Sequence, residues 1–269
     1  MIETKISVSA RVDALAESLS ALRAQGNLKD FTDVVKHLQK SLDLPLEVID
    51  QMIKIAEQEA RRARKALGSG MKEAAEKQGC HFDYRPPYIS FGCVTFHEQE
   101  KNPGTWELSI LDGVVIETLS SQNATRLAEA ALGKINRIKD ALSKEEAFVK
   151  NLIAAYEWWR LISPENRYVS PNLLMLLCTY GRGFRKQLTS AINTSSSPLA
   201  RAEFSYLLAR VHRRATEGVK GFPKMEFHGA TQHVTKDPFR FIAIPNLDDP
   251  CQMTQSQLIA GLALEPLGG

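Results

Sequence analysis

The basic side chains between Tyr180 and Lys224 are the strongest candidates in this chain for binding an anionic partner. Nine cations there face only two anions, Glu203 and Glu217, which gives the stretch a net charge of +7, whereas the whole chain carries +3. A concentrated positive surface attracts phosphate or an acidic protein. The predicted nucleic-acid contacts are Arg182, Arg185, Lys186, Arg210, Arg213, Arg214, Lys220 and Lys224.

Two parts of this stretch could form one groove along a nucleic-acid backbone. The segment 180–186 combines two glycines, an aromatic residue and three cations, which suits close approach to phosphates and stacking on bases. A helix predicted over about 198–216 has an apolar face, and we expect Tyr206, Arg210 and Arg213 to project from the opposite one. In a competing interpretation the arginines form a solvated face or pair with acidic residues of the N-terminal helices. Binding of an acidic protein partner is a related alternative.

Histidine and carboxylate side chains raise the alternative of a metal-dependent hydrolase or nuclease. The candidate ligands are His228, His233 and Asp237, or Glu98 and Glu100. On a strand, two residues five positions apart point to opposite faces, which argues against a metal shared by the two histidines. The chain has no phosphate-loop motif and no nucleophile elbow. We therefore assign no catalytic residue, no metal ligand and no cofactor.

The N-terminal part of the chain is predicted to form three helices, over 12–22, 31–42 and 45–67. Gly68 and Gly70 are expected to end the third helix. Its basic residues at 61–65 would then lie near a helix C-terminus, where cations offset the macrodipole.

Alternating apolar residues next predict a three-stranded antiparallel meander over 88–96, 106–110 and 114–119, with a tight turn at Asp112-Gly113. A helix follows over 127–142. Ser143 and Glu146 have the capping-box spacing, which predicts that another helix begins there and runs through Ile162. Further helices are expected to begin at Pro171 and Pro198.

Trp158 and Trp159 lie on the helix predicted to end at Ile162, which is apolar almost all round. Adjacent helical residues cannot point the same way, so one indole faces the local core and the other meets a second layer or a partner protein. Both tryptophans are therefore predicted to be partner-binding residues.

The C-terminal part predicts a β-hairpin, with strands over 225–234 and 239–244, followed by a tail from Asn246. The tail ends in Leu267-Gly268-Gly269, an ending that ubiquitin-like conjugation requires. The helix-rich body does not resemble a small ubiquitin-like domain, which favours a flexible tail instead.

Composition bounds the class of protein. With 43% hydrophobic and 24% charged residues, the 269-residue chain is expected to be globular. The N-terminus lacks a signal-peptide pattern and the apolar run 173–178 is too short to span a bilayer, which predicts a cytoplasmic protein without a membrane partner. The four cysteines form no Cys-x-x-Cys pair, which favours buried, reduced thiols.

Together these patterns predict an α+β protein that is predominantly helical, with a three-stranded antiparallel meander and a C-terminal β-hairpin. The expected modules are 1–75, 76–192 and 193–269. The expected function is that of a non-catalytic accessory or adaptor subunit in a nucleic-acid-associated complex, such as a prokaryotic DNA-processing or antiviral defence assembly with a motor ATPase. Its expected partners are other protein subunits and nucleic acid, DNA before RNA. A hydrolase and a pure protein-interaction subunit remain the alternatives.

Overall fold

The structure is a computed structural model, which describes residues 46–102, 104–111, 113–180, 198–236, 240–253 and 255–265. The chain is a mixed α+β protein, as predicted. The helices predicted over 12–22 and 31–42 and the Leu-Gly-Gly end lie outside the described residues. The elements are α3 (Leu46–Lys77), β1 (Phe82–Arg85), β2 (Tyr88–Phe91), β3 (Val94–Glu98), β4 (Thr105–Ile110), β5 (Val115–Ser120), α4 (Ala124–Leu142), α5 (Glu145–Ile162), α6 (Pro171–Tyr180), α8 (Pro198–Thr216), β6 (Met225–Gly229), η2 (Val234–Lys236), β7 (Ile242–Pro245) and β8 (Ser256–Leu264).

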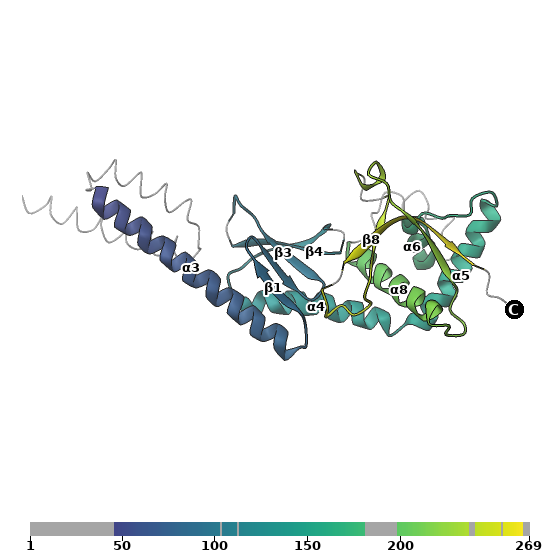
Figure 1. Ribbon diagram of the computed structural model, residues 1–269, viewed down its shortest axis with the longest axis horizontal. Helices are drawn as coiled ribbons and strands as arrows, with labels where there is room; N and C mark the ends of the chain where they lie inside the picture. Colours follow the sequence, from purple (N-terminus) through teal and green to yellow (C-terminus); the bar gives the residue numbers. More distant parts are fainter. Residues whose placement is uncertain are drawn as a thin grey trace, which may run out of the picture.

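Strands β1 to β5 form one antiparallel sheet in sequential order (Figure 1). The prediction of an antiparallel meander is confirmed, but the sheet has five strands where three were expected. Gly92 divides the apolar run 88–96 into β2 and β3, because its positive φ of 55° suits a two-residue turn between the paired residues Phe91 and Val94. The extra edge strand, β1, pairs with β2.

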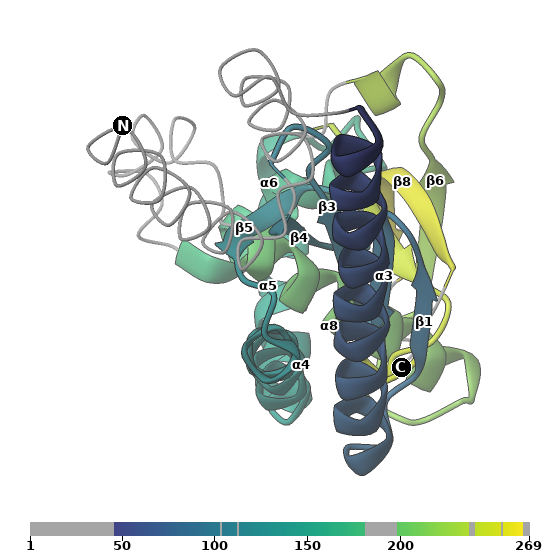
Figure 2. The same ribbon diagram turned by 90° about the vertical axis from the view of Figure 1, so that its left-hand side faces the viewer.

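Helix α3 continues to Lys77, so the prediction that Gly68 and Gly70 end it is wrong. The two glycines instead allow close packing. A Cβ atom at position 68 would lie 2.7 Å from the ring of Tyr84, and one at position 70 would lie 2.7 Å from Cβ of Ala124. The resulting contacts with β1 and the start of α4 offset a helix-propensity cost of about 1 kcal/mol per glycine. Figure 2 shows α3 running in front of the body of the molecule.

The first hydrophobic core lies between the five-stranded sheet and helices α3 and α4. Strand β4 shows the expected alternation, because Trp106, Leu108 and Ile110 are buried while the residues between them are half-buried. Apolar residues of α4 such as Ile135 and Ile138 cover these side chains. The first turns of α3 extend past the sheet (Figure 1).

A separate helix, α5, follows α4 as predicted, but the capping box at its start does not form. Helix α5 begins at Glu145 after Lys144, which makes no side-chain capping hydrogen bond. The hydroxyl of Ser143 donates to the carbonyl of Asp140, 2.7 Å away, and this residue closes the end of α4. Helices α6 and α8 begin at Pro171 and Pro198, as predicted.

The C-terminal strands form a three-stranded antiparallel sheet in the order β6-β8-β7. The predicted pairing of 225–234 with 239–244 is therefore wrong, because β6 and β7 each pair with β8. Strand β8 lies in the segment that the sequence assigned to a tail. Its apolar residues Ile259 and Leu262 are fully buried, so it forms the centre of this sheet.

Helix α8 lies between two cores, and the expectation that one of its faces is free is wrong. Tyr206, expected to project outward, is fully buried in the first core, whereas Phe204 and Leu208 belong to the second core with α5, α6 and the C-terminal sheet. A helix that contacts two cores must bury both sides. Within the described ranges, no helix has the length and apolarity needed to cross a membrane.

Candidate nucleic-acid interface

The end of α8 brings Arg210, Arg213 and Arg214 together, as the sequence predicts, and each has a carboxylate partner. Arg210 Nε lies 2.7 Å from Oδ2 of Asp248, and Arg213 Nη1 lies 2.6 Å from Oδ1 of the same residue. Arg214 Nη2 lies 3.1 Å from Oε1 of Glu145. Arg213 Nε also lies 3.7 Å from Oε1 of Glu217. The partners thus come from α5, from the loop after β7 and from the residue that follows α8.

The burial of Asp248 explains why two arginines converge on it. Its side chain is 5% exposed, and a buried carboxylate is costly unless cations or hydrogen-bond donors neutralise it. The side chains of Arg210 and Arg213 remain 27% and 50% exposed. This arginine cluster therefore holds the loop after β7 against α8, and its three cations share three carboxylates, those of Asp248, Glu145 and Glu217.

The other predicted contacts differ in their surroundings. Lys220 and Lys224 lie exposed between α8 and β6, and no ion pair joins either lysine to another described side chain. Arg182, Arg185 and Lys186 lie outside the described residues. The groove expected from 180–186 and α8 consequently has its α8 side committed largely to internal ion pairs.

A second group of cations lies on α3, and the sequence alone did not identify it as a candidate binding surface. Arg61, Arg62 and Lys65 are exposed, and among the described side chains none forms an ion pair with them. Because α3 continues to Lys77, these residues lie in the middle of the helix. The macrodipole acts within the last turn and does not account for them. Because the sequence predicted that α3 ends near Gly68, these cations were assigned to the helix macrodipole and not to a ligand. We call Arg61, Arg62 and Lys65 the α3 basic face.

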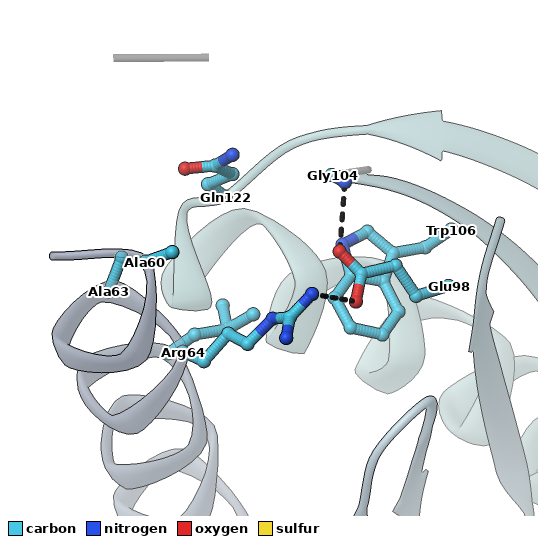
Figure 3. A pocket seen from close by; sticks show the side chains of 8 residues that line it. Ala60, Ala63, Arg64, Glu98, Gly104, Trp106 and Gln122 are labelled. Atoms are coloured by element: carbon cyan, nitrogen blue, oxygen red, sulfur yellow. Dashed lines mark hydrogen bonds and ion pairs between the residues drawn. The ribbon is translucent and has the colours of Figure 1, made fainter. Parts of the chain in front are cut away.

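Arg64, the fourth cation of this segment, joins α3 to the five-stranded sheet. Its Nη2 lies 3.6 Å from Oε2 of Glu98, whose Oε1 accepts a hydrogen bond of 3.0 Å from the Gly104 amide (Figure 3). The adjoining crevice, beside Trp106, has a volume of about 30 Å³. That volume holds about one water molecule, which is too small for an organic ligand. The role of Glu98 here is therefore structural: it links α3 to the five-stranded sheet.

The candidate metal ligands do not converge in the described part of the chain. His228 is exposed on β6 and contacts the ring of Tyr168, with 5.5 Å between centroids, while His233 is exposed in the following turn. Asp237 lies outside the described residues, and Glu100 is exposed after β3. Within those described residues, no three His, Cys, Asp or Glu side chains are grouped to hold a metal ion.

Trp158 and Trp159 are both half-buried and pack against the second core. The large apolar side chains that reach solvent on α5 are instead Leu161 and Ile162, which are 80% and 56% exposed. Leu161 lines an open groove of about 1120 Å³, whose other lining residues include Ile153, Tyr156, Arg160, Pro223 and Leu264. This end of α5 is therefore a candidate protein-contact surface.

Comparison with known proteins reveals no relative: no protein-family model matches the chain, and neither a curated protein nor a solved structure is significantly similar to it.

Proposed function

We propose that this protein is a non-catalytic accessory subunit of an assembly that acts on nucleic acid, and that the α3 basic face contacts the phosphate backbone. The exposure of Arg61, Arg62 and Lys65 without a described acidic partner carries this proposal. Cations that no described carboxylate neutralises can replace the counterions of DNA. All three residues lie on one helix, α3, whose first turns extend past the five-stranded sheet (Figure 1).

The cations of the 180–224 stretch have two roles in this proposal. Arg210, Arg213 and Arg214 are positioning residues, because their carboxylate partners neutralise most of their charge. Lys220 and Lys224 provide a second, smaller phosphate contact. Phosphate contacts of this kind fix the position of a protein on DNA without reading its sequence.

The same proposal assigns other protein subunits to the exposed end of α5. Leu161 and Ile162 would be costly to leave in water, and exposed apolar residues beside a groove are typical of protein-contact surfaces. Purification of the tagged protein from its native host after nuclease treatment tests this part. Co-purification of an ATPase or nuclease subunit, abolished in a Leu161→Glu variant, is the expected result. A protein that is recovered alone contradicts the subunit assignment.

Fluorescence anisotropy with a short DNA duplex tests the nucleic-acid part. Replacing Arg61, Arg62 and Lys65 with Glu should weaken binding at least about tenfold at low salt. The same replacement should reduce the salt slope by about 0.9 for each phosphate that the protein no longer neutralises. The matched control replaces Arg126, Lys144 and Lys150, three exposed cations of α4, α5 and the junction between them, with Glu, which changes the net charge equally.

The control variant should keep most of the affinity, and both variants should unfold at the same urea concentration as the unaltered protein. Equal weakening by the two variants would show that only net charge matters. No measurable DNA binding, together with a protein partner that no longer binds when the α3 basic face is changed, would favour the acidic-protein alternative.

A further inference from the structure

Two cysteines that are far apart in the sequence meet in the first core. Sγ of Cys80 lies 2.9 Å from Sγ of Cys251, and the two residues are 7% and 5% exposed. Cys80 follows the turn that ends α3, whereas Cys251 belongs to the loop between β7 and β8. This contact therefore joins the five-stranded sheet region to the C-terminal sheet.

Backbone hydrogen bonds hold the two cysteines in place. The amide of His81 donates to the carbonyl of Cys251 at 2.8 Å, and the amide of Cys93 donates to the carbonyl of Pro250 at 2.9 Å. The Asp249 carboxylate accepts from the amide of Cys251 at 2.9 Å. Because the main chain is fixed on both sides of the contact, a bond between the two sulfurs requires little movement of the backbone.

The surroundings distinguish the two thiols. A hydrogen bond with Cys251 raises the pKa of Lys139, so an exposed ammonium group lies next to the sulfur of Cys251. Burial, together with the hydrogen bond to Cys251, raises the pKa of Cys80 to about 12, so the Cys80 thiol resists losing its proton. The lysine lies beside the other sulfur. This asymmetry favours Cys251 as the sulfur that attacks first and Cys80 as the sulfur that follows.

We propose that Cys80 and Cys251 form a reversible oxidation site for hydroperoxides, in which Lys139 is the positioning residue. The thiolate of Cys251 attacks one oxygen of hydrogen peroxide, the O–O bond breaks, and the sulfur becomes a sulfenic acid while the second oxygen leaves as water after taking up a proton. The sulfur of Cys80 then displaces the hydroxyl group of that sulfenic acid. A disulfide forms, and the proton of Cys80 leaves with the hydroxyl as a second water molecule.

The other two cysteines lack these features. Burial raises the pKa of both Cys93 and Cys178 to about 12. Cys93 interacts with Tyr206 and, through charge, with Cys251, but the described sulfur–sulfur contact of 2.9 Å is that of Cys80 and Cys251. No described sulfur lies within hydrogen-bonding distance of Cys178. The disulfide would fasten the loop between β7 and β8, which also carries Asp248, to the end of α3. Oxidation would therefore restrict movement between the two sheets.

The test treats the full-length reduced protein with hydrogen peroxide, blocks the remaining thiols and identifies cross-linked peptides by mass spectrometry. We expect a mass decrease equal to two hydrogen atoms, a peptide pair containing Cys80 and Cys251, and reversal by dithiothreitol. A Cys178→Ser control should react like the unaltered protein. Cross-links that exclude this pair, or stable sulfenic acid at both positions, would overturn the proposal.

Variants separate the roles within the site. Cys80→Ser should stop the reaction at sulfenic acid on Cys251, which a dimedone-type probe detects, whereas Cys251→Ser should leave Cys80 unmodified. Lys139→Gln should slow disulfide formation about tenfold, and Lys139→Arg should restore most of the rate because it keeps the charge. Equal rates in the Gln and Arg variants, at either the original or the reduced level, would overturn the role of Lys139. The peptide analysis of the unaltered protein decides the proposal even where a serine variant does not fold.

Discussion

Nε of Arg210 lies 2.7 Å from Oδ2 of Asp248, whose side chain is 5% exposed. This ion pair links the middle of the chain's most basic segment to a loop of the C-terminal sheet. The positive charge at this point of the sequence therefore serves an internal ion pair. The cations that can bind a ligand are those that no carboxylate neutralises.

Replacement of Asp248 tests the structural role of the arginine cluster. Asp248→Asn keeps the shape of the side chain but removes the charge that Arg210 and Arg213 share. Because both arginines remain partly exposed, we expect a loss of about 2 kcal/mol in the free energy of unfolding, less than for a fully buried pair. Urea denaturation measures it. Glu129→Gln, at an exposed position of α4, is the control and should change stability little. Equal stability of the two variants would contradict the role of Asp248.

The sequence predicted those parts of the fold that local patterns determine. The alternation in β4 and the proline at the start of α8 both act over a few residues. The predicted turn at Asp112-Gly113 includes Asp112, which lies outside the described residues. Strand β8 was missed because its partners, β6 and β7, lie elsewhere in the chain, and Gly261 within it resembles a loop residue. Glycine at position 261 instead serves tertiary packing, because a Cβ there would lie 3.1 Å from Cβ of Tyr168.

The candidate site was predicted in part for the same reason. Composition identified the cations of α8, but their partners Glu145 and Asp248 approach only after α5 and the C-terminal sheet have packed around that helix. The α3 basic face could be recognised only by knowing where α3 ends. Two glycines that serve close packing resembled a helix stop, so the end was placed too early. Spacing alone does not distinguish these two uses of glycine.

Gly92 should be among the positions least tolerant of a side chain. Its φ is +55°, and a Cβ atom would lie 2.6 Å from the carbonyl oxygen of Pro250. We expect Gly92→Ala to reduce the free energy of unfolding by about 3 kcal/mol, from the left-handed backbone and the displaced loop together. Gly113→Ala is the matched control: its φ is +73° and nothing lies within 4 Å, so a loss of about 1 kcal/mol is expected. Similar losses at both positions would show that the contact with Pro250 is unimportant.

Two helical glycines should respond oppositely to alanine. Gly133, in α4, has nothing within 4 Å of a Cβ atom, so Gly133→Ala should raise the free energy of unfolding by about 0.5–1 kcal/mol through helix propensity. Gly70→Ala, in α3, should lower it by at least about 1 kcal/mol, because the new methyl group meets Cβ of Ala124. Thermal or urea unfolding measures both. A stabilising change at position 70 would contradict the close approach of α3 to α4.

The pH dependence of stability should include a contribution from His212. Burial lowers the pKa of this imidazole from its ordinary 6.5, and its ring packs on Phe227 with 4.8 Å between centroids. The unfolded chain exposes the ring and so binds the proton first as the pH falls. The contribution to stability is therefore complete above about pH 6.5 and is lost as the pH falls toward the folded-state pKa. Urea midpoints measured between about pH 7.5 and pH 5 should decline less steeply in His212→Gln than in the unaltered protein or in a control, His233→Gln, at an exposed position. An unchanged slope in His212→Gln would show that this imidazole accepts its proton equally well in the folded and unfolded states.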